Sequence, residues 1–232
     1  MADKHTPDMY KNHRQRLRRA ASENGAESLD NYKLLELLLF DALPRIDTYP
    51  LAHRLLDRFK TLDGVFSAQK EELLSVEGVG PKTAAFIECI GALVTRTVLD
   101  DMTKAPLDSE TAAFPVLLWL LRNVPTDTTL VVALDDNYGF IEYFLMPPGH
   151  DVKGYKKSIK RAGDVGAKRV IFAHKHPDRA PRPTPDDVRV TELLDEYCEK
   201  LGIILVGHYI VVGGKKAVSV ISDEYLKDKY GK

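Results

Sequence analysis

The chain has 232 residues, of which 44% are hydrophobic and 29% are charged. This composition is ordinary for globular proteins and leaves room for two domains with their own cores, so it excludes a disordered chain. With 33 basic and 34 acidic residues, the formal net charge is −1. The chain as a whole therefore has no field that would attract nucleic acid, and any such binding must come from a local patch.

Cysteine usage and hydropathy narrow the class of protein further. Cys89 and Cys198 are far apart and neither belongs to a CxxC pair, which argues against a disulfide framework or a thiolate zinc site. The polar N-terminus has no apolar stretch after its charges, and no segment has the length of a membrane span. The sequence indicates a soluble, cytoplasmic protein with no membrane partner.

The first hundred residues have the pattern of helices. They open on a basic run, KNHRQRLRRA at 11–20, which contains no acid, and the nearly all-apolar stretch NYKLLELLLFDAL follows it. Further along, a turn at Gly78 to Gly80 meets Pro81, a residue typical of the first position of a helix. The polar segment DDMTKAPLDSE then predicts a mobile domain boundary near residue 104.

Beyond this segment the pattern changes to that of an α/β unit. A helix, TAAFPVLLWLLRN, precedes two alternating strands, TLVVALDD and GFIEYFLM, which are joined by a turn. A helix near 155–162, a strand KRVIFAH, a helix from Pro185 and two closing strands complete the pattern. Residues 105–232 are therefore predicted to form a second domain.

The predicted strand KRVIFAH ends at His174, and a second histidine, His176, follows two residues later. Side chains two residues apart on a strand point the same way, so His174 and His176 are expected within reach of one ion. A catalytic zinc takes three ligands from histidine and carboxylate and leaves a fourth position to water. Asp187, after a loop, can supply the third, which predicts one Zn²⁺ per chain; His150 and His208 are further candidates.

A zinc site for hydrolysis also needs a general base. Glu142 is an acid inside the otherwise apolar strand GFIEYFLM, which makes it the candidate, with Asp135 and Asp136 just upstream as competitors. A simpler interpretation of the other residues is also open. Thr184 to Asp187 has the pattern of a helix start, with Thr184 as N-cap and an acid at N3, and a lone HxH pair is weak evidence for a metal.

The spacing HxHP, six residues, Thr184, two residues, Asp187 resembles the JAMM (MPN-plus) signature. In the first half, HRQRLR, YKLLELLLF, HRLLDRF and SVEGVGPKTAAF resemble the RadC family of bacterial JAB-domain proteins. The resemblance implies an α+β chain: an all-α helix-hairpin-helix domain over 1–104, then an α/β JAMM domain over 105–232 with a mixed sheet flanked by helices.

The same resemblance implies roles for individual residues. It makes His174, His176 and Asp187 the zinc ligands, places Glu142 on the glutamate-bearing strand, and puts Thr184 where the family has a serine that steadies the oxyanion. One segment departs from the family pattern: MPPGHDVKGYKK lacks the arginine expected there, which puts substrate recognition in doubt.

The segment SVEGVGPKTAAF looks like a helix-hairpin-helix. Gly78 and Gly80 let backbone N–H groups turn outward at a helix N-terminus, where a phosphate is attracted, and Lys82 adds a full charge. Together with Arg14 and Arg16 of the basic run, these residues predict sequence-independent DNA binding. The hairpin serves equally well as a protein-packing element, and the basic run can be a solvated helix face.

Three functions follow from these features. The leading one is a zinc metallopeptidase that cleaves a peptide or isopeptide bond in a protein substrate. The second is a DNA-associated repair or recombination accessory protein, in which the hairpin binds the DNA backbone and the JAMM domain is nuclease-like or non-catalytic. The third, a metal-free scaffold, is disfavoured by the complete ligand set. Metal content would discriminate among them.

Overall fold

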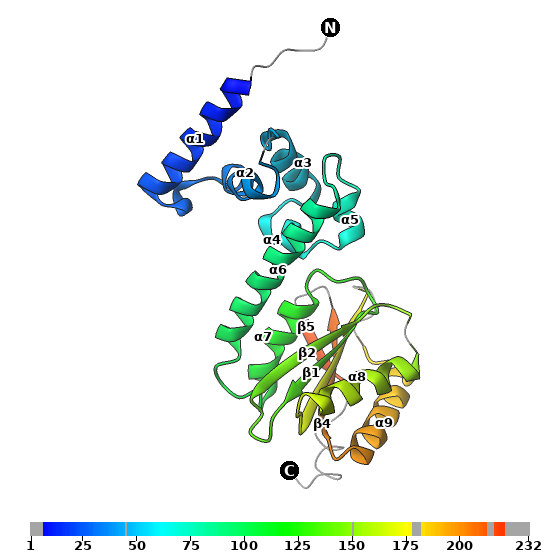
Figure 1. Cartoon of the computed structure of the whole chain (residues 1–232). Coiled ribbons are helices and arrows are strands. Elements are labelled where there is room, and N and C mark those ends of the chain that lie inside the picture. Colours follow the sequence, from blue (N-terminus) through cyan, green and yellow to red (C-terminus); the bar gives the residue numbers. More distant parts are fainter. Residues whose placement is uncertain (1–6, 45, 150, 178–181, 213–215, 221–232) are drawn as a thin grey trace. The chain divides into compact units, whose positions relative to one another are not determined.

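The computed structural model describes residues 7–44, 46–149, 151–177, 182–212 and 216–220 (Figure 1). The chain divides into two compact units, residues 1–96 and 97–232. The dividing point lies inside helix α6 (Pro81–Met102) rather than in the polar segment that follows it. That segment is held by the second unit, since Leu107 is buried and its N–H donates to the carbonyl of Tyr138 at 2.9 Å.

The first unit is helical, as predicted. Its elements are α1 (Pro7–Asn24), the short 3-10 helix η1 (Ala26–Ser28), α2 (Asn31–Ala42), α3 (Tyr49–Phe59), α4 (Leu62–Ser67), α5 (Lys70–Leu74) and the first part of α6. Side-chain caps start two of the helices: Asp30 accepts from the N–H of Lys33, and Thr61 from that of Gly64. The core is formed by apolar residues at helical spacing, including Leu35, Leu39, Leu55, Val65 and Ile87.

The second unit is a mixed sheet covered by helices. Its elements are α7 (Glu110–Leu121), β1 (Thr129–Leu134), β2 (Phe140–Met146), α8 (Val152–Asp164), β3 (Arg169–His176), α9 (Pro185–Lys200), β4 (Ile204–Val212) and β5 (Lys216–Ser219). The strand order is β2-β1-β3-β4-β5. Among the five described strands, only β3 and β4 pair in parallel, and the connection between them contains α9. The predicted α+β fold is confirmed.

Helices cover both faces of the sheet (Figure 1), and each face has its own core. Leu117 and Leu121 of α7 pack with Val132 and Ile171 on one face. On the other face, α8 and α9 cover strand residues of the opposite parity, including Val131, Val170 and Phe172. The alternation of side chains along the strands assigns each residue to one of these two cores. Among the described residues, no helix is both long and apolar enough to cross a membrane.

Candidate metal centre

The alternation of β3 brings the two predicted histidine ligands to the same face. Val170 and Phe172 point into the α8–α9 core, so His174 and His176, of the same parity, lie on that face at the end of the strand. The intervening Lys175 points the other way. Its Nζ donates to the carbonyls of Arg122 and Val124, at 3.0 and 2.8 Å, next to the C-terminus of α7.

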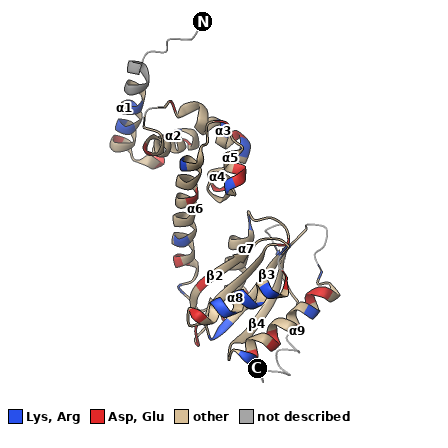
Figure 2. Ribbon diagram, turned by 45° about the vertical axis from the view of Figure 1, so that its right-hand side comes forward, with Lys and Arg blue, Asp and Glu red and all other residues tan. Residues whose placement is uncertain are grey.

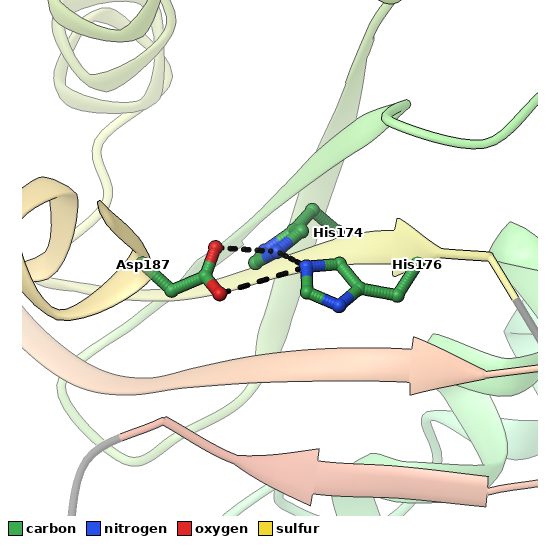
Figure 3. Close-up of side chains that lie close together, drawn as sticks. All are labelled: His174, His176 and Asp187. Atoms are coloured by element: carbon green, nitrogen blue, oxygen red, sulfur yellow. Dashed lines mark hydrogen bonds and ion pairs between the residues drawn. The ribbon is translucent and has the colours of Figure 1, made fainter. Parts of the chain in front are cut away.

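His174, His176 and Asp187 converge (Figure 3). Nε2 of His174 is 3.1 Å from Oδ1 of Asp187, and Nε2 of His176 is 3.6 Å from Oδ2. The two Nε2 atoms are 2.8 Å apart. One donor atom of each residue lies within 4.8 Å of the others, so the residues that the sequence selected are brought together.

The position of Asp187 satisfies both interpretations of the sequence, because this residue caps α9 and faces the histidines. Its N–H donates to Oγ1 of Thr184 at 3.2 Å, while the N–H and hydroxyl of Thr184 donate to its Oδ2 at 2.6 and 2.7 Å. Burial alone would raise the pKa of Asp187, but the hydrogen bonds from His174 and Thr184 outweigh it and hold that pKa below its usual range. The Thr184 hydroxyl gives its only proton to Asp187, which makes it an orienting group in this geometry.

His208, a further candidate metal ligand, contacts His174 and does not belong to the converging set of three residues. It is buried on β4, with Nε2 2.9 Å from Nδ1 of His174 and Nδ1 2.6 Å from Oγ1 of Thr191. The Thr191 hydroxyl donates onward to the carbonyl of Asp187 at 2.7 Å. The other candidate, His150, lies outside the described residues.

The direction of these hydrogen bonds fixes the tautomers. If His174 presents Nε2 to the cluster, its Nδ1 carries the proton and donates to His208, which then donates from Nδ1 to Thr191. This arrangement requires a neutral His208. Burial lowers the pKa of His208 to about 3, with a smaller contribution from His174, which is consistent with that requirement.

The chemistry of the three donors fits a zinc ion. Two imidazole nitrogens and a carboxylate converge on one point, where either a shared proton or, once the histidines are neutral, a metal cation offsets the lone pairs that face one another. Three ligands of this kind with a fourth position open to a pocket are typical of a catalytic zinc. Hydrogen bonds from His174 to His208 and from Thr184 to Asp187 would hold two of the ligands in orientation.

The cluster lines a pocket of about 220 Å³, formed by Asp127, Thr129, Tyr155, His174, His176, Asp186, Asp187, Val190 and His208. Asp127, which the sequence analysis missed, is an acid outside the converging set. Its N–H donates at 2.7 Å to the carbonyl of Lys175, the residue between the two histidines. The available signal was its place two residues before β1, the strand beside β3. Asp186 pairs with Arg189 at 3.0 Å.

The structure does not bring Glu142 to this pocket. Glu142 pairs with Ala133, whose partner on β3 is Val170, whereas His174 pairs with Thr129. Val170 and His174 are four residues apart along β3, which corresponds to about 13 Å. Glu142 therefore lies near the other end of the sheet, and the position expected for it across the cleft is not observed.

The competing acids, Asp135 and Asp136, follow β1 at the end of the sheet far from His174. Oδ1 of Asp135 accepts from the N–H groups of Asn137 and Gly139, both at 2.7 Å. Asp136 pairs with Arg169 at 3.1 Å. Both carboxylates have their partners at this end of the sheet, so neither replaces Glu142.

The predicted hairpin joins α5 to α6. Gly78 has φ 93°, a conformation that favours glycine, and Gly80 and Lys82 are exposed at the start of α6. Arg16 is also exposed, on α1. Arg14 is used differently, because its guanidinium donates to the carbonyls of Phe40, Leu43, Pro44 and Ile46 at the end of α2.

The fold and the site define a JAB-domain protein with a helix-hairpin-helix. Comparison with family models agrees: residues 107–225 match the RadC-like JAB domain, and residues 61–86 match the helix-hairpin-helix motif. The chain belongs to the RadC-like JAB-domain family, which confirms the resemblance seen in the sequence.

Curated relatives cover most of the chain. A UPF0758 protein from Fusobacterium nucleatum is 31% identical over 86% of this chain and 90% of its own length. A UPF0758 protein from Ruegeria pomeroyi is 29% identical over 95% of this chain and all of its own length. A third, from Rhodobacter capsulatus, is 31% identical over 86% of this chain and 95% of its own. These names specify no reaction.

Proposed function

We propose that this chain is a zinc-dependent hydrolase of the JAMM type that cleaves a peptide or isopeptide bond. The observation that carries the proposal is the convergence of His174, His176 and Asp187 within 4.8 Å at the wall of a pocket. The pocket also holds Asp127, an acid that does not belong to the converging set. A ligand set and a separate base are the two parts that such a hydrolase needs.

The roles of the residues follow from their positions. When bound, zinc would polarise the scissile carbonyl and lower the pKa of a water molecule in the pocket. Asp127 takes the proton of the attacking water and returns it to the leaving amine, the role that the sequence analysis gave to Glu142. Thr184 orients Asp187, and His208 orients His174.

Metal analysis tests the ligand set. Full-length protein purified without chelator should contain about one zinc per chain, and His176→Ala should lose it. The matched control is His53→Ala, which removes a histidine that stacks on Tyr32 and contacts Tyr49 at a tilt in the helical unit. If wild-type protein holds no zinc under zinc-replete conditions, the proposal is wrong and a metal-free scaffold is the better interpretation.

A second candidate function, association with DNA, is favoured by the hairpin. Gly78, Gly80 and Lys82 are exposed where α6 begins, so backbone N–H groups at a helix N-terminus and a full charge are available to a phosphate. Duplex DNA should bind at low salt without sequence preference, and Lys82→Ala with Arg16→Ala should weaken it. Absence of any binding at low salt would assign the hairpin to protein contacts.

A further inference from the structure

Helix α8 carries a concentrated positive charge in the unit that holds the metal pocket. Its cations are Lys153, Lys156, Lys157, Lys160 and Arg161, and all five are exposed. No acid occurs between the N-cap Asp151 and Asp164 at the end of the helix. In a chain whose net charge is −1, this helix is a strong local source of positive potential.

The geometry of the helix gathers the cations on one side. At 3.6 residues per turn, Lys153, Lys157 and Lys160 form a row, and all five cations fall within an arc of about 140°. We call this row with its two flanking cations the α8 basic face; Figure 2 shows its blue segments along the helix. The opposite side carries Ile159 and Ala162, which are fully buried against the sheet. The basic face therefore points away from the sheet.

Neighbouring groups leave this charge unneutralised. Among the described residues, no ion pair involves any of the five cations; Arg161 lies over the ring of Phe144, and Lys156 over that of Tyr197. Helix α9 packs against α8 through a small apolar groove to which it contributes Val190 and Tyr197. Its acids at 192, 196 and 199 lie on the far side of α9 from these two residues at helical spacing.

The kind of partner follows from the chemistry of the face. Lys153 and Lys160 are about 10 Å apart along the helix axis, a length over which a DNA strand advances by about three phosphates at about 3.4 Å of duplex axis for each. Lysine ammonium groups act as point charges, which hold phosphates without reading bases. A membrane surface would need an apolar side to insert beside the charges, and in α8 that side is buried against the sheet.

We propose that the α8 basic face binds the phosphate backbone of duplex nucleic acid. This surface belongs to the sheet unit and is distinct from the hairpin, which belongs to the helical unit. Tyr155 of the same helix lines the metal pocket from the opposite side, the one that faces the sheet. The hairpin supplies an independent reason to choose nucleic acid over an acidic protein segment as the partner.

Binding of full-length protein to a fluorescent duplex DNA of about 20 base pairs tests the proposal across a salt series. The variant Lys153→Gln/Lys157→Gln/Lys160→Gln should lose at least about tenfold in affinity at low salt. The slope of log affinity against log salt should fall by about 0.9 for each phosphate that the variant no longer neutralises. The matched control, Lys60→Gln/Lys200→Gln/Lys216→Gln, removes the same charge from exposed lysines elsewhere and should retain nearly wild-type binding.

Three results would overturn the proposal. An equal loss in both triple variants would mean that only net charge matters. Loss in Lys82→Gln with none in the α8 variant would assign all binding to the hairpin. Competition by polyglutamate as effective as that by unlabelled DNA, at equal charge, would make α8 a site for acidic proteins. Zinc content and circular dichroism of each variant confirm that it has folded, and the result does not depend on hydrolysis.

Discussion

His174 and His208 face each other across neighbouring parallel strands, with Nδ1 of the first 2.9 Å from Nε2 of the second. This pairing leaves His174 one free nitrogen, the one aimed at Asp187 and His176. Thr191 completes the arrangement, since its hydroxyl accepts from His208 and donates to the backbone of Asp187. The two ligands are thus connected through the buried residues His208 and Thr191.

We predict that Thr191→Val weakens zinc binding by about 10–100-fold, because His208 loses its acceptor and no longer fixes the tautomer of His174. Chelator competition on the full chain measures this change, and Thr191→Ser should restore affinity. Thr128→Val is the control, since the buried Thr128 hydroxyl has no hydrogen-bond partner among the described residues. If the valine and serine variants bind zinc alike, the relay has no orienting role.

The position of the general base gives a second prediction. Asp127→Asn should reduce hydrolysis by about 10²–10⁴-fold while zinc content stays at the wild-type level, because only the proton acceptor is removed. Glu142→Gln is the matched control and should leave the rate unchanged, since Glu142 pairs with Ala133 at the far end of the sheet. New peptide termini, detected by mass spectrometry after incubation of a peptide pool with zinc-loaded protein, provide the readout. The reverse result would restore Glu142 as the base.

The metal ligands could be predicted from the sequence, whereas the position of the general base could not. The ligands were found because period-two alternation and a helix cap are local properties of HKH and TPDD, and both survive in the fold. The strand that carries Glu142 could be predicted from the sequence. The position of Glu142 along the sheet, however, depends on the register in which β1 pairs with β2 and β3. Asp127 lies in a short polar turn that has no periodicity, and only the pairing of β1 with β3 places it beside the histidines.

The roles of Arg14 and of the α8 cations also depend on tertiary packing, which the sequence alone does not show. The basic run is visible in the sequence, but the turn of Arg14 toward the end of α2 results from tertiary packing over more than 25 residues. The cations of α8 were present in the sequence as well. Their alignment on one side became informative only when Ile159 and Ala162 showed which side of the helix is buried.

Arg14 should therefore contribute to stability rather than to DNA binding. Arg14→Gln removes hydrogen bonds from a charged donor to carbonyls just after the end of α2, so local opening there should become easier by about 1–3 kcal/mol. Hydrogen exchange of peptides from α2, followed by mass spectrometry, measures this. Arg16→Gln, on the exposed side of α1, should change exchange by less than about 0.5 kcal/mol. Equal effects of the two variants would contradict the capping role.

The two cysteines should respond differently to alkylation. Cys89 is exposed on α6, whereas Cys198 lies on the buried side of α9, in the core between that helix and the sheet. Burial, with smaller contributions from Asp195 and Glu199, raises the pKa of the Cys198 thiol to about 12 from an ordinary value of 9.0. Iodoacetamide should modify only Cys89 in the folded chain and both residues in urea, as measured by peptide mass spectrometry.

By proton linkage, the raised pKa of Cys198 predicts that the folded chain loses stability at alkaline pH. The folded chain holds this proton more tightly than the unfolded chain, so the stabilising effect is complete below about pH 9 and is lost as pH rises toward about 12. Between about pH 8 and pH 10, the urea midpoint of the wild type should fall more than that of Cys198→Ala. The alanine variant starts lower because it leaves a cavity, so the comparison uses the change with pH in each protein. Parallel curves for the two proteins would show that Cys198 titrates normally and that its thiol is not sealed in the core.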